Sequence, residues 1–114
     1  MATTVRVTGI VGSLRAASYN GWLLRAAAEL APPELTIASF AGLADVPVYS
    51  QDLEAQGDPA GVAALRAAVR GADAVLIASP EYNYGVPGVL KNAIDWISRP
   101  PRQAPFHGKP VAIM

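Results

Sequence analysis

The stretch that decides the fold is Ala74-Val75-Leu76-Ile77-Ala78-Ser79-Pro80-Glu81-Tyr82-Asn83-Tyr84-Gly85-Val86-Pro87-Gly88. Its first five residues are apolar and predict a buried strand. The next ten are rich in proline, glycine and tyrosine and predict a loop that leads into a helix. In open α/β sheets, ligands bind in the crevice at the carboxyl ends of the strands. Residues 79–88 are therefore a first candidate for a ligand-binding loop.

A second loop of the same kind follows an earlier apolar run. Residues 4–11 predict a strand, and the sequence that follows it is Gly12-Ser13-Leu14-Arg15-Ala16-Ala17-Ser18-Tyr19-Asn20. Ser13, Ser18 and Asn20 can place hydroxyl and amide groups around a phosphate beside the N-terminus of the next helix. Arg15 adds a forked cationic donor. The alternative is that Ser18 only caps this helix and that Arg15 is only a solvated charge.

The loop at 79–88 has the composition that a flat aromatic ligand requires. Tyr82 and Tyr84 flank Asn83, and the glycines at 85 and 88 let the backbone approach a ring closely. A phosphate loop and an aromatic loop at two strand ends favour one phosphate-bearing aromatic cofactor, and we expect flavin mononucleotide (FMN). The alternatives are a plain turn into a helix that begins at Pro87, or a contact between subunits made by the tyrosines.

The rest of the chain alternates between segments with the apolar spacing of helices and apolar runs typical of strands. Ser18 is the expected cap of a helix that Pro32-Pro33 ends, and its apolar positions are Trp22, Leu23, Ala26, Ala27 and Leu30. Further helices are expected from Asp58-Pro59, with Asp58 as the cap, to Gly71, and from Pro87 to Ser98. Further strands are expected at 35–40 and 111–114, and residues 41–57 are expected to be a long loop. This βαβαβαβ order predicts an α/β fold with a doubly wound parallel sheet.

Composition limits the classes of function. The 114 residues are 52% hydrophobic and predict one globular domain over 1–114. Nine basic residues balance nine acidic ones, so we expect neither nucleic acid nor a membrane surface as a partner. The chain has no cysteine, which excludes disulfides and thiolate metal sites, and no metal site is expected. No apolar run approaches a membrane span, so a cytoplasmic location is the expectation.

Several conspicuous residues have simple explanations. Lys91 and Asp95 lie one helical turn apart and predict a surface ion pair. Trp22 and Trp96 are expected to lie in the core or at a subunit interface. His107 has no second ligand at metal-binding spacing, so we expect it to be exposed.

With both loops in hand, the chain resembles the NADPH-dependent FMN reductase family, a flavodoxin-like group that includes bacterial chromate and quinone reductases. The resemblance lies in residues 12–20 and 80–96 and extends through 47–53 and 108–111. It implies that the FMN phosphate and ribityl chain are held by Ser13, Arg15, Ser18 and Asn20. It also implies that the flavin ring is lined by Pro80, Glu81, Tyr82 and Asn83, with Tyr84 at the open face or a neighbouring subunit.

The resemblance implies a function as well. A hydride would pass from NADPH or NADH to FMN, and then to a quinone, chromate, azo or flavin acceptor. No side chain need act as an acid or base, so no catalytic residue is assigned. The rival functions are a flavodoxin-like electron carrier and a non-catalytic remnant.

The resemblance also concerns assembly and extent. The resemblance implies a homodimer or homotetramer. Residues 41–57 and the helix that carries Trp96 are the candidate contacts between subunits. The chain ends at Met114 inside an apolar strand. We therefore expect a truncated flavodoxin-like domain whose missing C-terminal part would hold a fifth strand, two helices and a third flavin loop.

Overall fold

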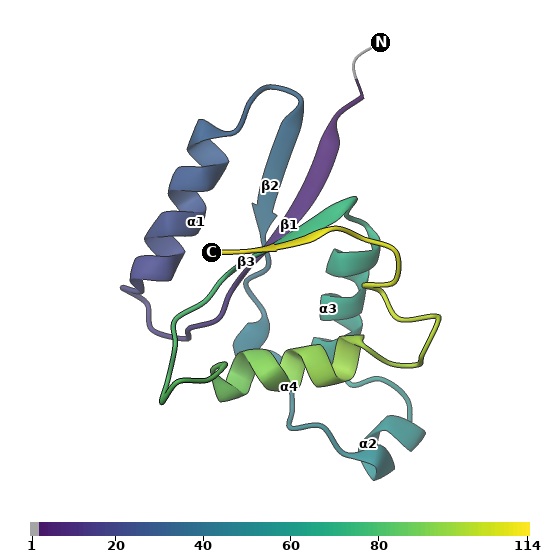
Figure 1. The fold of residues 1–114 in the computed structure, drawn as a ribbon. Helices are drawn as coiled ribbons and strands as arrows, with labels where there is room; N and C mark the ends of the chain where they lie inside the picture. The colour runs from purple at the N-terminus through teal and green to yellow at the C-terminus, as the bar shows by residue number, and fades with distance from the viewer. Residues whose placement is uncertain (1–2) are drawn as a thin grey trace.

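The computed structural model describes residues 3–114, which alternate between strands and helices as expected (Figure 1). The strands are β1 (Val5–Val11), β2 (Leu35–Ser39), β3 (Ala74–Ala78) and β4 (Val111–Ile113). The helices are α1 (Tyr19–Leu30), α2 (Gln51–Ala55), α3 (Ala60–Arg70) and α4 (Gly88–Ile97), and η1 (Leu43–Asp45) is a 3₁₀ turn. Within residues 3–114, none of the helices has the length and apolar character needed to cross a membrane.

All four strands run parallel in one sheet, in the order β2-β1-β3-β4. This is the flavodoxin-type strand order, and it confirms the predicted doubly wound fold. Neighbouring residues of β1 show that both faces are covered. A methyl group added at Gly9 would lie 2.8 Å from the Leu24 side chain of α1, whereas the Thr8 hydroxyl donates to the Ala68 carbonyl of α3 at 2.7 Å. Accordingly, α1 covers one face, and α3 and α4 cover the other (Figure 1).

The hydrophobic core lies between the sheet and the pair α3 and α4. Its fully buried side chains come from β1 and β3 and from both of these helices. They include Ile10, Val62, Leu65, Val69, Val75 and Ile97. Trp96 belongs to this core because none of its surface is exposed. Its indole Nε1 donates to the Pro47 carbonyl at 2.8 Å, so the one polar atom of this side chain is satisfied. Of the two places expected for this tryptophan, the structure selects the core.

The rotation of α1 differs from what its apolar pattern suggested. Leu24 is the residue that α1 buries, whereas Trp22, Leu23 and Leu30 are 48%, 44% and 84% exposed. The cause is Gly9, which leaves a notch in the sheet that the Leu24 side chain fills. Because this contact fixes the rotation of the helix, the apolar stripe from 22 to 30 lies largely at the protein surface.

The prediction of one long loop at 41–57 is wrong, because this segment contains η1 and α2. Leu43 and Val46 are buried, and the Ser50 hydroxyl caps α2 by accepting the Leu53 amide at 3.4 Å. Both helical pieces are too short to give a periodic pattern. The prediction of Asp58 as the cap of α3 is also wrong: Pro59 holds that position, and the Asp58 carboxylate pairs with Arg66 instead.

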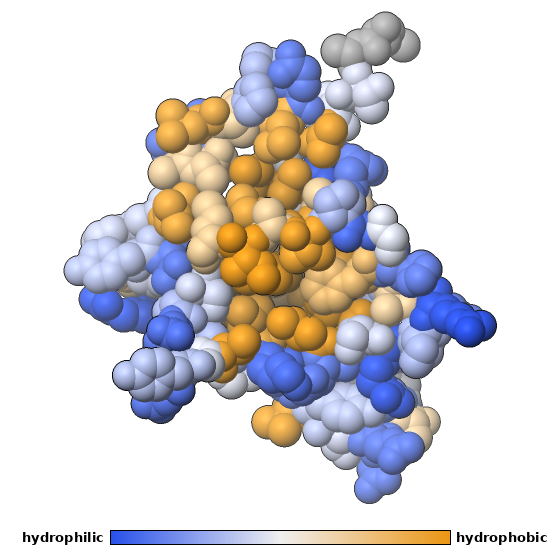
Figure 2. Space-filling model, in the orientation of Figure 1, coloured by the Kyte–Doolittle hydropathy of each residue, from blue (hydrophilic) through white to orange (hydrophobic). Residues whose placement is uncertain are grey.

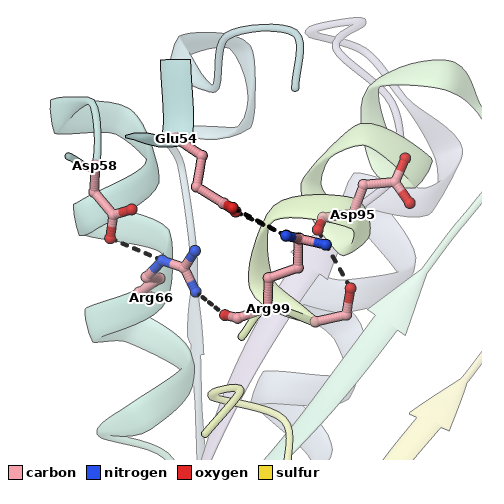
Figure 3. Close-up of polar contacts among 6 residues, drawn as sticks. Glu54, Asp58, Arg66, Asp95 and Arg99 are labelled. Atoms are coloured by element: carbon pink, nitrogen blue, oxygen red, sulfur yellow. Dashed lines mark hydrogen bonds and ion pairs between the residues drawn. The ribbon is translucent and has the colours of Figure 1, made fainter. Parts of the chain in front are cut away.

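Polar bonds tie the segment at 47–54 to α4 and to Arg99 just after it; Figure 3 shows the pair of Glu54 and Arg99. The Asn92 side chain accepts the Tyr49 amide and donates to the Pro47 carbonyl, both at 2.8 Å. Glu54 and Arg99 form a two-pronged ion pair, with distances of 2.8 and 3.1 Å. This arginine beside it lowers the pKa of the Glu54 carboxyl. The segment is therefore held along the length of α4.

Arg66 is a buried charge next to this ion pair. Its Nε lies 2.8 Å from the Asp58 carboxylate, and its Nη1 donates to the backbone carbonyl of Arg99 (Figure 3). One guanidinium of α3 therefore contacts a residue just before α3 and a residue just after α4. A buried charge of this kind requires such partners to offset its desolvation.

The two lysines have contrasting environments. The Lys109 ammonium donates to three backbone carbonyls at the C-terminal end of α3, those of Val69, Arg70 and Ala72. It thereby adds a cationic donor to carbonyls at the end of the helix, where few amide partners remain. Lys91 forms the predicted surface ion pair with Asp95 at 2.7 Å. His107 is exposed, as expected.

Apolar side chains gather on the face where β4 lies (Figure 2). Val111 and Ile113 of β4 are 44% and 75% exposed. Ile113 also lines a cavity of about 360 Å³ together with Ile77, Leu90 and Ile94. The edge of the sheet at β4 is thus apolar and open to solvent.

Gly61 gives a test of the packing between α3 and η1. A methyl group at this position would lie 2.1 Å from the Asp45 carbonyl oxygen, so we expect Gly61→Ala to lower the free energy of unfolding by about 2 kcal/mol or more. Gly88→Ala is the matched control, because a methyl group there meets nothing within 4 Å. Urea denaturation measures both variants. Equal stabilities of the two would contradict the described contact.

Glu54 gives a test of pH dependence. Its pKa is lowered in the fold, so its contribution to stability is present above about pH 4 and is lost as the pH falls through the lowered pKa. We expect Glu54→Gln to weaken the protein near neutral pH and to reduce the loss of stability on acidification. Urea midpoints across this pH range measure the effect. Glu29→Gln on the exposed surface of α1 is the control and should leave the acid profile unchanged.

Candidate functional site

The two predicted loops meet at the carboxyl ends of β1 and β3. The Gly12 amide donates to the Ala78 carbonyl at 2.8 Å. A methyl group at Gly12 would lie 2.7 Å from the Ser79 hydroxyl oxygen and 3.0 Å from the Leu90 side chain. A side chain at this position would displace the Ser79 and Leu90 side chains. The two loops are therefore in direct contact where the strand order of the sheet reverses.

Hydroxyl groups brace the first loop. The Ser13 hydroxyl accepts the Arg15 amide, and the Ser18 hydroxyl accepts the Asn20 amide, both at 3.2 Å. This confirms Ser18 as the cap of α1. Each hydroxyl uses only its oxygen in these bonds, so its hydrogen can be donated to a ligand. Capping and phosphate binding are thus compatible roles for the same serine.

The first loop also presents positive charge. In residues 3–114, no hydrogen bond uses the amides of Leu14, Ala16 and Ala17. The first turn of α1 has no acidic residue, so the positive end of the helix dipole is not neutralised. The exposed Arg15 guanidinium lies 5.9 Å from the centre of the Tyr19 ring. Free amides at a helix N-terminus beside an arginine suit an anion.

A cavity of about 490 Å³ opens beside this loop. Three of the four predicted phosphate residues line it, namely Ser13, Arg15 and Ser18, whereas Asn20 does not. Its wall also includes Arg25 of α1 and Phe40 just after β2, which the sequence analysis did not identify. The sequence could have pointed to Arg25, because Arg25 follows Ser18 by seven residues and so lies on the same face of the helix.

The second loop contains a tight turn at its tip. Tyr82 and Gly85 exchange two backbone hydrogen bonds, of 3.1 and 3.0 Å. Asn83 and Tyr84 between them have positive φ angles, 52° and 63°, which is the type I′ geometry. Asparagine tolerates this conformation, but a bulky tyrosine is strained in it. Strain of this kind often accompanies a functional site.

The predicted ring residues lie along this turn and the segment before it. Pro80, Glu81 and Tyr84 line the cavity of about 360 Å³ next to α4. Tyr82 and Asn83 line neither this cavity nor the one at the first loop. The two cavities share no residue, so the structure brings the loops together at Gly12 and Ser79 without joining all nine predicted residues around one space.

The sequence model of the NADPH-dependent FMN reductase family matches residues 5–114. The chain belongs to this family. An NAD(P)H-dependent FMN reductase of Pseudomonas aeruginosa is 51% identical over 114 residues, which are 100% of this chain and 60% of that protein. A quinone reductase of Escherichia coli K12 is 46% identical over 99% of this chain and 60% of its own length.

A solved structure agrees with the family assignment. FerB of Paracoccus denitrificans, a flavoenzyme NAD(P)H:(acceptor) oxidoreductase, matches this family member with a TM-score of 0.88 and 40% sequence identity. The match covers 97% of this chain and 60% of FerB. The chain thus spans about 60% of the length of the relatives it matches.

The strained turn gives a test at the site. Tyr84→Gly would create an Asn-Gly pair, the preferred sequence of a type I′ turn, and should raise the free energy of unfolding by about 1 kcal/mol. Val86→Gly is the control, because Val86 is an exposed apolar residue of the same loop without a positive φ. It should be neutral or destabilising. A loss of stability in Tyr84→Gly would contradict the strain described here.

Proposed function

We propose that the chain supplies the FMN-binding part of an NAD(P)H-dependent oxidoreductase that reduces quinones. The observation that carries the proposal is the meeting of a phosphate-type loop and an aromatic loop at Gly12, where the strand order reverses. The membership of the NADPH-dependent FMN reductase family supports it. Bound FMN would accept a hydride and pass the electrons on, which is chemistry that the protein itself cannot supply.

The first loop is the proposed seat of the FMN phosphate. Ser13 and Ser18 would donate their hydroxyl hydrogens, and Arg15 would bind two phosphate oxygens with its fork. Asn20 would reach the phosphate or the ribityl chain from the first turn of α1. The braced loop, the unused amides and the adjoining cavity support this arrangement.

The second loop is the proposed seat of the flavin ring. Pro80, Glu81, Tyr82 and Asn83 would line it, and the backbone of the loop would bond its polar edge. Tyr84 is 96% exposed and would border the open face, where the co-substrate and the acceptor bind in turn. The hydrogen-bonded turn supports this role, because it fixes the path of the backbone before any ligand arrives.

The co-substrate and the acceptor are proposed with different support. NAD(P)H appears in the names of the P. aeruginosa relative and of FerB, and quinone appears in the name of the E. coli relative. Chromate, azo and flavin acceptors rest on the family resemblance alone. The protein would orient the two rings without a side chain acting as an acid or base.

Assembly and location belong to the same proposal. The exposed stripe of α1, with Trp22, Leu23 and Leu30, is an apolar surface that a homodimer or homotetramer would bury. Sedimentation velocity measures the oligomeric state, and a monomer at all concentrations would contradict this part. A cytoplasmic location stays a prediction.

The test combines binding and chemistry. The 114-residue chain is titrated with FMN, and a chimera joins residues 1–114 to the remaining C-terminal part of the E. coli quinone reductase. NADPH is then added to the flavin-loaded chimera without oxygen. Flavin bleaching supports the oxidoreductase. Bleaching by dithionite but not by NADPH favours the flavodoxin-like electron carrier. A folded chimera that binds no FMN overturns the proposal and favours the non-catalytic remnant.

Arg15 gives a quantitative prediction. A charge-assisted hydrogen bond contributes about 1.5–3 kcal/mol, so Arg15→Gln should raise the Kd for FMN about 10- to 100-fold. Arg70→Gln is the matched control, because Arg70 is an exposed helical arginine of α3, on the opposite face of the sheet from α1. Quenching of flavin fluorescence measures both. An unchanged Kd for Arg15→Gln would assign Arg15 to the solvated surface.

A further inference from the structure

The cavity beside the first loop has two cationic ends. Arg15 lines it from the first loop, and Arg25 lines it from α1; we call these two parts the first and the second end. Arg25 follows Ser18 by seven residues, which places its backbone about 10 Å further along the helix. One phosphate seated among the loop amides contacts the first end only, so the second end is available to a different anionic group.

The charge of Arg25 is not neutralised by the protein. In the part of the chain that the structure describes, the ion pairs involve Arg66, Lys91 and Arg99, and none involves Arg25. The Arg25 residue is exposed, and Gly21 lies between it and Ser18 on the cavity wall. Because glycine has no side chain, the wall between the two ends stays open.

The cavity also offers an aromatic ring and a hydroxyl. Ser39 and Phe40 reach the cavity from the end of β2. A methyl group at Gly42 would lie 2.9 Å from the tip of the Phe40 ring, so the backbone at Gly42 packs against this ring and helps to hold it. A guanidinium that lines the same cavity as an aromatic ring and a serine suits a purine nucleotide that carries a phosphate on its sugar.

The sheet places this end at a useful distance from the proposed flavin loop. The cavity end follows β2, the flavin loop follows β3, and β1 lies between these two strands. Two strand spacings separate them by about 10 Å. An extended dinucleotide can bridge such a gap, with its nicotinamide over the flavin loop and its adenosine at the second end.

We propose that Arg25 binds the 2′-phosphate of NADPH, with Phe40 against the adenine, and that this contact makes the protein prefer NADPH to NADH. The inference rests on the proposed function and adds a specificity residue to it. NADH has a hydroxyl where NADPH has this phosphate, so Arg25 would have no anionic partner in the NADH complex.

The experiment titrates the 114-residue chain with adenosine 2′,5′-bisphosphate and with adenosine 5′-monophosphate by calorimetry. We expect the bisphosphate to bind about tenfold more tightly, and we expect Arg25→Gln to abolish this difference. Arg25→Lys should retain part of it, and the control Arg70→Gln should retain all of it. Circular dichroism checks that each variant is folded.

FMN titrations of the same variants separate this inference from the proposed function. Unchanged FMN binding in Arg25→Gln, with loss of the preference for the bisphosphate, supports the proposal. Equal affinities of the native chain for the two nucleotides would overturn it. Weakened FMN binding in Arg25→Gln would also overturn it, because Arg25 would then belong to the FMN phosphate site. If the chain binds the bisphosphate through Arg25 but the folded chimera binds no FMN, the proposed function is overturned instead.

Discussion

The hydrogen bond from the Gly12 amide to the Ala78 carbonyl fixes the geometry on which the candidate site depends. It extends the pairing of β1 with β3 by one residue beyond Val11 and Ala78, into the loops themselves. The missing side chain at Gly12 lets Ser79 and Leu90 close over the crossing. Each loop then departs from a fixed point. Rigid strands thus set the positions of groups that lie on irregular backbone, which is the usual division of labour in α/β proteins.

Much of this arrangement could be predicted from the sequence because its signals are local. The apolar run at 74–78, the Ser18 cap and the proline and glycine positions each act within a few residues, and they sufficed for the order of helices and strands along the chain and for both loops. The two loops already pointed to FMN, and the family resemblance added the expected roles of the loop residues and the expected reaction. Those roles remain predictions, because binding depends on a ligand and not on the chain alone.

The features that escaped prediction depend on partners distant in sequence. Asp58 has the sequence position of a helix cap, but in the structure its carboxylate pairs with the buried guanidinium of Arg66. The rotation of α1 follows from the notch at Gly9 and not from the helix's own apolar pattern. The segment from Pro47 to Glu54, which follows η1 and includes most of α2, is held by Asn92, Trp96 and Arg99, across more than forty residues. No local pattern encodes such contacts.

Lys109 has a chemical consequence of its own. All three hydrogens of its ammonium are donated to carbonyls at the end of α3. The only other lysine of the chain, Lys91, has a side chain that is 60% exposed. Acylating reagents need an accessible amine with a free lone pair. In the native protein we therefore expect them to modify Lys91 faster than Lys109. Modification of Lys109 therefore reports how often the end of α3 separates from the segment that leads into β4.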